Sequence, residues 1–275
     1  MLKISFRFVA PACLALAFAL FGTAAVIAQN TDDEWSGFYA GGYVGVTHAR
    51  PNVNTSTVFS PTGYFAQSSV TAINADGTRS LKSNGFTGGG QFGYNKQFGR
   101  IVVGAEADFG AQQISESDSV SRQYPCCAPT AYTITQEVKS NWLFTARPRV
   151  GVTAGKALIY GTGGLAVTDI KYSAAFTDTF AAALETSEFK KTKAGYTVGG
   201  GVEVKVAKKW SVKGEYLYSD FGRESVTSTN LSSEFTSDLE APSGVIGRET
   251  WPENVFTHST KIKSHNFRFG VNYRF

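Results

Sequence analysis

Apolar and polar residues alternate with a period of two along much of this chain. The pattern is clearest at the carboxyl end, where "SHNFRFGVNYRF" places an apolar side chain at every second position from Phe267 to Phe275. A period of two is typical of a β-strand with one face against an apolar environment. Chain ends of soluble domains are usually frayed and polar. We therefore expect these last residues to form a strand that has an apolar surface to face.

Seven other segments alternate in the same way, which gives eight predicted strands. The strands cover residues 36–48, 84–98, 101–112, 140–154, 157–172, 193–206, 210–221 and 261–275. Each is about ten residues or longer, the length of a tilted membrane-spanning strand. Three connections are short (99–100, 155–156 and 207–209), and four are long and rich in Ser, Thr, Asn and Asp (49–83, 113–139, 173–192 and 222–260). This arrangement predicts an all-β fold, an eight-stranded antiparallel up-and-down transmembrane β-barrel with both termini on the short-turn, periplasmic side.

The apolar phase of these strands is expected to face lipid. A soluble, lipocalin-like barrel is the alternative, and it would place the apolar set inside. Eight strands enclose a lumen only just wide enough for side chains, so the aromatic series has no room there. The expected outward set is Phe86, Phe92, Tyr94, Trp142, Phe144, Val150, Val152, Tyr196, Val198, Val202, Val204, Val206, Trp210, Val212, Tyr216, Tyr218, Phe267, Phe269, Val271, Tyr273 and Phe275. The fifth segment, with Ile159, Leu165 and Val167, has apolar residues in both phases, and its register stays open.

The opposite phase carries charged residues, six cations and four anions. They are Glu106, Asp108, Arg147, Arg149, Glu203, Lys205, Lys213, Glu215, Arg268 and Arg274. Charges that leave water need partners, so we predict a network of ion pairs across the barrel that fills the lumen. A narrow, cation-lined pore is the alternative interpretation of the same residues.

The N-terminal segment predicts export. Lys3 and Arg7 precede an almost wholly apolar stretch, residues 9–27, and small residues offer a cleavage site after Ala28. Such a pattern is typical of a secretory signal peptide. We expect residues 1–28 to be the signal peptide and residues 29–275 to form the barrel domain. Cleavage after Ala25 and a retained signal anchor are the alternatives.

Composition supports a β-rich chain and gives no reason to expect nucleic acid. Only 17% of residues are charged, glycine is abundant at 29, and the formal net charge is small at +4. Glycine is unfavourable in helices, and aromatic residues favour strands. After the predicted signal peptide no run of about 18 apolar residues indicates a transmembrane helix.

Two adjacent cysteines, Cys126 and Cys127, lie in a predicted loop. They are too few to hold a structural metal ion, which typically takes about four ligands. In an exported protein they can form a vicinal or intermolecular disulfide. Two loop thiols without a role are the alternative.

A glycine pattern resembles a dinucleotide-binding motif. "GGGQFG" places Gly88, Gly90 and Gly93 in the spacing G-x-G-x-x-G. That motif needs glycines that follow a strand and open a helix, whereas these lie within a predicted strand. We expect no cofactor, and we expect the glycines to make room for bulky inward neighbours.

Catalysis finds little support among the three histidines, His48, His258 and His265. A Ser–His–acid group can be assembled on paper from Ser264, His258 and Glu253. Such combinations are common in any sequence, and geometry is the test. We expect the protein not to be an enzyme.

Five stretches, "WSGFYAGGYVG", "GFTGGGQFGYN", "VVGAEADF", "GGGVEVKVAKKWSVKGEYLYSDFG" and "HNFRFGVNYRF", resemble the small outer-membrane barrels of alphaproteobacteria. That family comprises the 25- and 31-kilodalton outer-membrane proteins, often labelled porins, and related hemin-binding proteins. The resemblance covers all predicted strands, is most specific over residues 199–222, and does not extend to the long loops.

The resemblance implies a location in the outer membrane of a Gram-negative cell, in contact with outer-membrane lipid and lipopolysaccharide. It also implies insertion by the barrel assembly machinery, which recognises a last strand ending in an aromatic residue. Here that signal is Phe267, Phe269, Val271, Tyr273 and Phe275.

The implied role is envelope integrity with surface exposure, as in a surface antigen. A small pore for ions or solutes is one alternative. Binding of a host component or hemin through the loops at 113–139 and 222–260 is another, although no His pair or Tyr–His spacing marks a heme site.

Overall fold

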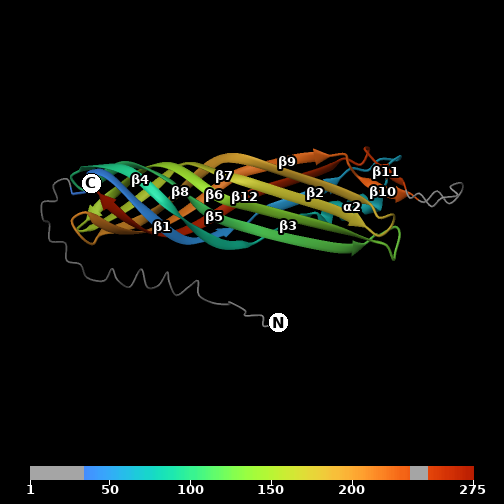
Figure 1. The fold of residues 1–275 in the computed structure, drawn as a ribbon, viewed down its shortest axis with the longest axis horizontal. Coiled ribbons are helices and arrows are strands. Elements are labelled where there is room, and N and C mark those ends of the chain that lie inside the picture. Colours follow the sequence, from blue (N-terminus) through green and yellow to red (C-terminus); the bar gives the residue numbers. More distant parts are fainter. Residues whose placement is uncertain (1–33, 236–246) are drawn as a thin grey trace, which may run out of the picture.

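The structure is a computed structural model that describes residues 34–235 and 247–275, so the expected signal peptide lies outside the described residues. Within the described chain, eight long strands form a closed antiparallel ring (Figure 1). They are β1 (Gly37–Ala49), β4 (Ser83–Phe98), β5 (Ile101–Gln123), β6 (Ala131–Ala154), β7 (Ala157–Asp178), β8 (Leu184–Lys205), β9 (Trp210–Ser228) and β12 (Phe256–Arg274). The last of them, β12, pairs with both β9 and β1, and this closes the ring. The predicted fold class is confirmed.

The three short turns lie at one end of the barrel, here called the turn end, and the opposite end is called the loop end. The carboxyl terminus lies at the turn end (Figure 1), where the Phe275 N–H donates to the Phe38 carbonyl at 3.1 Å. Gly99 and Gly155 have φ of 60° and 58°, in the left-handed region that favours glycine. The turns expected at 99–100 and 155–156 are therefore confirmed, with the residues that tight turns require.

Several strands are longer than the sequence predicts, and three of the expected long loops are mostly strand. The connection expected at 113–139 shrinks to the residues between Gln123 and Ala131, and that at 173–192 to the residues between Asp178 and Leu184. The strands therefore rise well beyond the apolar part of the barrel and form a stalk at the loop end (Figure 1).

The polarity of the two faces reverses along this stalk. On β5, Ile114 and Val120 point inward and are buried, while Ser115, Ser117 and Ser119 are exposed. A strand in water buries its apolar face and exposes its polar one. The serine-rich outward positions read as loop in the sequence, which is why these extensions were not predicted.

The connection at 49–83 is also more ordered than predicted, because it contains two strands and a helix. These elements are β2 (Asn52–Thr57), α2 (Gln67–Asp76) and β3 (Thr78–Ser80). The helix has no side-chain cap at its N-terminus. It is held by burial of Val70 and Ile73 in an apolar cluster with Val120 and Ile134.

Two further short strands, β10 (Ser232–Phe235) and β11 (Gly247–Thr250), pair with each other at the loop end. Among the described residues no helix is long and apolar enough to cross a membrane.

The wall of the stalk has two seams. The pairing of β8 with β9 stops at Tyr196–Asp220, and that of β4 with β5 stops at Thr87–Gln112. Meanwhile β5 to β8 continue as one sheet, and β9, β12, β2 and β3 continue as another. Side chains cross the seams through ion pairs that include Arg79–Asp118, Arg122–Asp76, Lys191–Glu224 and Lys193–Glu224.

Candidate functional site in the barrel interior

An apolar belt surrounds the half of the barrel nearest the turn end. Every member of the predicted outward set is exposed or half-buried, and none is buried. Phe269 is 57% exposed and Phe98 61%, although both belong to well-formed strands. The register left open for the fifth segment is also settled, because Ile159 and Leu165 point outward while Leu158 and Tyr160 are buried inside.

Inside the belt, eight of the ten predicted lumen charges form one ion-pair network. Arg147 lies near its centre, with guanidinium nitrogens 2.8 Å from Glu106, 2.9 Å from Asp108 and 3.3 Å from Glu215. Arg268 reaches Asp108 at 3.0 Å from β12 on the other side of the barrel. The network therefore spans the lumen.

Glu106 joins three cations. Besides Arg147, its carboxylate lies 2.8 Å from the Lys213 ammonium and 3.5 Å from Arg149. Arg149 in turn lies 2.9 Å from Glu203. The eight charges balance, four of each sign, and all eight side chains are almost fully buried. Buried charges need partners of opposite sign, and each of the eight has at least one.

The other two predicted members lie outside the network, at the turn end. Lys205 makes an ion pair with Glu34 at 3.2 Å, and its ammonium lies 5.1 Å from the centre of the Trp35 ring. Arg274 donates to the Trp35 carbonyl and stacks on the same ring at 5.0 Å. Their inward phase was predicted, but their height in the barrel brings them to Glu34 and Trp35 instead of to the four acidic residues of the network.

Three inward tyrosines, which alternation alone does not predict, complete the network. Tyr39 donates to Glu106 at 2.8 Å and Tyr160 to Glu215 at 2.9 Å. The Arg149 guanidinium lies between these two rings, 4.9 and 4.8 Å from their centres. Tyr43 underlies Arg268 in the same way, at 4.3 Å. The expectation that aromatic residues have no room inside is therefore wrong for these positions.

Glycines opposite the tyrosines provide the room. A Cβ at Gly93 would lie 2.3 Å from the Tyr39 hydroxyl, and one at Gly201 would lie 2.8 Å from the Tyr160 hydroxyl. The prediction that Gly93 makes space for a bulky inward neighbour is confirmed. An inward tyrosine paired with a glycine on the next strand is the signal that could have identified these residues.

Beyond the charges the interior continues as layers. On the loop side a polar layer follows, in which Ser140 contacts Thr168 at 2.7 Å. Gln91 lies opposite Asp108, among the charges, and donates to Asn272 at 2.6 Å, while Asn272 donates to Glu203 at 3.0 Å. An apolar cluster then fills the base of the stalk. Its members include Val53, Ile114, Val138, Leu143, Ile170, Tyr172, Phe221 and Ile262. An apolar cluster thus lies on the loop side of the ion pairs.

The possible Ser–His–acid group is not assembled. His258 is fully buried in the stalk, where its ring nitrogens contact Glu185 at 3.2 Å and Thr55 at 3.0 Å. Ser264 lies six residues further along β12, about 20 Å in an extended strand, and Glu253 is exposed in a loop. In the part of the chain that the structure describes, no group of three or more His, Cys, Asp and Glu residues could hold a metal ion.

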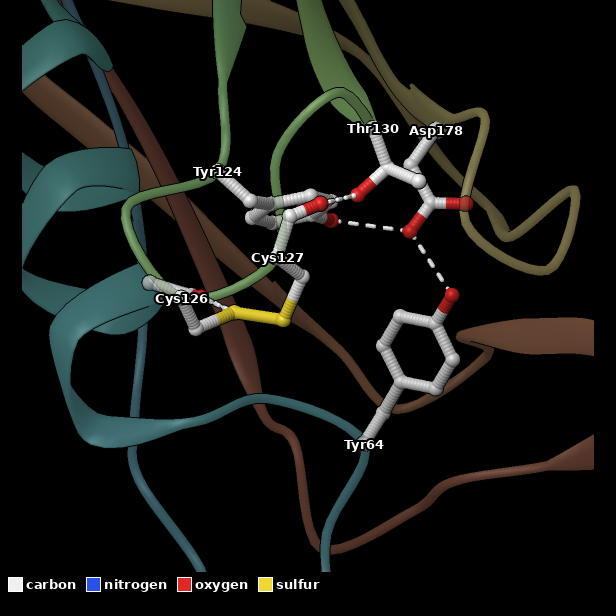
Figure 2. The surroundings of a disulfide bond; sticks show 7 residues. Tyr64, Tyr124, Cys126, Cys127, Thr130 and Asp178 are labelled. Atoms are coloured by element: carbon white, nitrogen blue, oxygen red, sulfur yellow. Dashed lines mark hydrogen bonds between the residues drawn. A yellow bond between two sulfur atoms is a disulfide. The ribbon is translucent and has the colours of Figure 1, made fainter.

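The two cysteines form a vicinal disulfide at the tip of the β5–β6 hairpin (Figure 2). Beside it, the Asp178 carboxylate accepts hydrogen bonds from Tyr64 at 2.7 Å and Tyr124 at 2.8 Å. Burial raises the pKa of both phenols well above the ordinary value, and the neighbouring carboxylate raises it further. Asp178 also accepts the Ala183 N–H at 2.9 Å, so it ties three segments together.

Comparison with known proteins gives a consistent result. Residues 14–275 match a family model described as outer membrane protein beta-barrel domain. A 31 kDa outer-membrane immunogenic protein of Brucella melitensis is 31% identical over 273 residues, which cover 95% of this chain and 98% of that protein. A 22 kDa outer membrane protein of Rhizobium leguminosarum is 37% identical over 137 residues, half of this chain and 53% of that protein. Among solved structures, the outer membrane protein OprG of Pseudomonas aeruginosa matches with a TM-score of 0.42 and 14% identity, over 87% of this chain and 96% of that one.

Proposed function

This chain belongs to the outer membrane protein beta-barrel domain family, and from that premise we propose that it is a structural barrel that supports the integrity of the cell envelope. It is an outer-membrane protein, as its relatives are. In the proposed arrangement the turn end faces the periplasm, and the stalk rises from the cell surface.

The buried ion-pair network is the observation that supports the proposal. Four buried cations and four buried anions cross-link five of the eight ring strands. Apolar side chains close the next part of the interior. A barrel filled in this way gains rigidity instead of a wide passage. A small pore for ions or solutes is the alternative, and electrical conductance separates the two.

Deletion of the gene tests the structural role. We expect the deletion strain to grow normally in rich medium but to lose resistance to detergent and to divalent-cation chelators, with recovery when the intact protein is restored. An unchanged envelope, measured by detergent tolerance and by entry of an impermeant dye, would overturn the proposal.

Assembly by the barrel assembly machinery is part of the proposal, because β12 supplies a carboxyl-terminal run of outward apolar side chains. Phe275 is 71% exposed, and its side chain is not needed to fill the interior. Replacement of Phe275 by Ser should lower the amount of folded protein in the outer membrane several-fold while refolding in detergent stays unchanged. Equal amounts of both proteins in isolated outer membranes would contradict the assembly role.

A binding role for the stalk is a second candidate. Val58, Phe59 and Phe180 are each more than 40% exposed at the loop end, away from the apolar belt. Exposed apolar side chains grouped at a tip are typical of contact surfaces. If the stalk binds a host component, joint replacement of Phe59 and Phe180 by Ser should abolish binding to host cells and leave the barrel folded. Unchanged binding would exclude this tip as the contact surface.

A further inference from the structure

Four cations gather on the outer face just beyond the apolar belt. This basic patch consists of Arg50, Arg223, Lys261 and Lys263. Lys261 and Arg223 are direct cross-strand partners on β12 and β9. The backbone N–H of Arg50 donates to the backbone carbonyl of Lys263 at 3.0 Å, which places the segment after β1 beside β12. The patch therefore spans three neighbouring segments of the wall.

The patch has more positive than negative charge. Asp220 is the one carboxylate within ion-pair distance of it in the described chain, 3.4 Å from the Lys261 ammonium and 3.7 Å from that of Lys263. Arg50 and Arg223 are exposed, and neither has an ion-pair partner among the described residues. Like charges directly opposite each other on adjacent strands are unfavourable. The arrangement is therefore suited to an anion from outside the chain.

The depth of the patch in the barrel points to the kind of anion. The next outward pair toward the belt is His48 opposite His265, and the pair after it is Val46 opposite Phe267. Phe267 is 42% exposed and Val46 49%, as expected for side chains in contact with lipid. Two outward steps along a strand cover about 13 Å. The cations thus lie where lipid head groups begin.

A second group of lysines has a different charge balance. Lys139, Lys171 and Lys190 are cross-strand partners on β6, β7 and β8. Lys139 is paired with Glu137 at 2.6 Å. The next row of exterior side chains toward the loop end consists of Glu137, Ser173 and Glu188. Two acidic residues thus offset two of the three lysines, so this row serves as a control for charge alone.

We propose that the basic patch binds the phosphate groups of a phosphorylated glycolipid, lipid A, in the outer leaflet. Two guanidinium groups can each hold a phosphate by paired hydrogen bonds, and the apolar belt below accommodates the acyl chains. The inference depends on the proposed orientation of the barrel, with the loop end at the cell surface, and not on the filled lumen.

Titration of the refolded protein in zwitterionic detergent with fluorescent lipid A tests the proposal, using lipid A with both phosphates and lipid A with none. We expect the dephosphorylated form to bind at least tenfold more weakly. The double variant Arg50→Gln/Arg223→Gln should weaken binding of the phosphorylated form about 25-fold, since each cation near a lipid surface contributes about fivefold. The matched variant Lys171→Gln/Lys190→Gln removes the same charge and should change it less than twofold.

Heat-modifiable electrophoretic mobility shows whether each variant retains its barrel. If both double variants lost the same affinity for phosphorylated lipid A, the attraction would depend on total charge alone, and the proposed site would be contradicted. Equal binding of lipid A without phosphates, or of phosphatidylglycerol, would overturn the ligand. Because detergent micelles have no sides, these results do not depend on the envelope role, which the deletion strain tests separately.

Discussion

At the scale of single residues, the ion-pair network depends on carboxylates that each contact more than one cation. Glu106 contacts Arg147, Lys213 and Arg149, and it also accepts the Tyr39 hydroxyl. Removal of one member of a buried ion pair leaves an uncompensated charge, whose cost exceeds the strength of the lost contact. The consequences of a change at Glu106 should therefore extend to three cations.

Replacement of Glu106 by Gln should lower the free energy of unfolding by about 3–5 kcal/mol. Glu188→Gln, which alters an exposed carboxylate on β8, should change it by less than about 0.5 kcal/mol. Urea unfolding of the refolded protein in lipid vesicles measures both. Equal stabilities of the two variants would show that Glu106 does not hold the network together.

The tip of the stalk should weaken in alkali. The pKa of Tyr64 and that of Tyr124 are raised in the folded protein by burial and by Asp178. A group whose folded pKa lies above its unfolded value stabilises the fold below the unfolded pKa, about 10 for tyrosine, and this contribution is lost as the pH rises further. Proteinase K should therefore cut the tip faster above pH 10 than at pH 8.

The double variant Tyr64→Phe/Tyr124→Phe provides the control for this pH dependence. Its tip should be cut faster at pH 8, because two hydrogen bonds to a carboxylate are lost. It should also show a smaller increase in cutting between pH 8 and pH 11. The same pH dependence in the variant and the parent protein would contradict the role of the two phenols.

At the scale of elements, the predictability of each part follows from its surroundings. In the belt, lipid outside and ion pairs inside impose opposite polarities, so the alternation was visible and the outward set was correct. In the stalk, water outside and an apolar core inside reverse that relation, so the outward serines of β5 have the composition of a loop. A β-bulge between Lys139 and Leu143 moves the inward phase of β6 by one residue, a shift that alternation alone does not locate.

Alternation predicted which side chains point into the barrel, but not how far along the barrel axis each one lies. Eight charged residues form ion pairs because their strands place them in the same layer of the interior. Lys205 and Arg274 lie instead in the layer of Trp35. Height depends on strand tilt and on where each turn begins, and neither can be read from alternation. The tyrosines were missed because an aromatic inside an eight-stranded barrel requires a glycine on the neighbouring strand.

Two glycines on β4 test whether an inward tyrosine requires a glycine on the neighbouring strand. Gly93→Ala would put a methyl group 2.3 Å from the Tyr39 hydroxyl and 2.7 Å from the Ala105 carbonyl. We expect a loss of about 1–3 kcal/mol in the free energy of unfolding. Gly90→Ala, on the same strand, meets nothing nearer than 3.9 Å and should cost less than about 0.5 kcal/mol. A greater loss at Gly90 would contradict this account of the interior.

At the scale of the whole molecule, one chain builds two kinds of wall. Within the belt, eight strands close completely, which satisfies every backbone group in lipid. In the stalk, where water can solvate free backbone groups, the wall divides at two seams that ion pairs cross. Buried ion pairs lie inside the belt, and apolar clusters lie inside the stalk.

The central claim is that this interior leaves no open passage, and single-channel recording of the refolded protein in a planar lipid bilayer tests it most directly. Heat-modifiable mobility on gels confirms that the inserted protein is folded. The filled lumen predicts a folded protein that gives no steady openings at any salt concentration. Reproducible openings whose conductance rises with salt concentration would contradict it and would show that the ten inward charges line a pore.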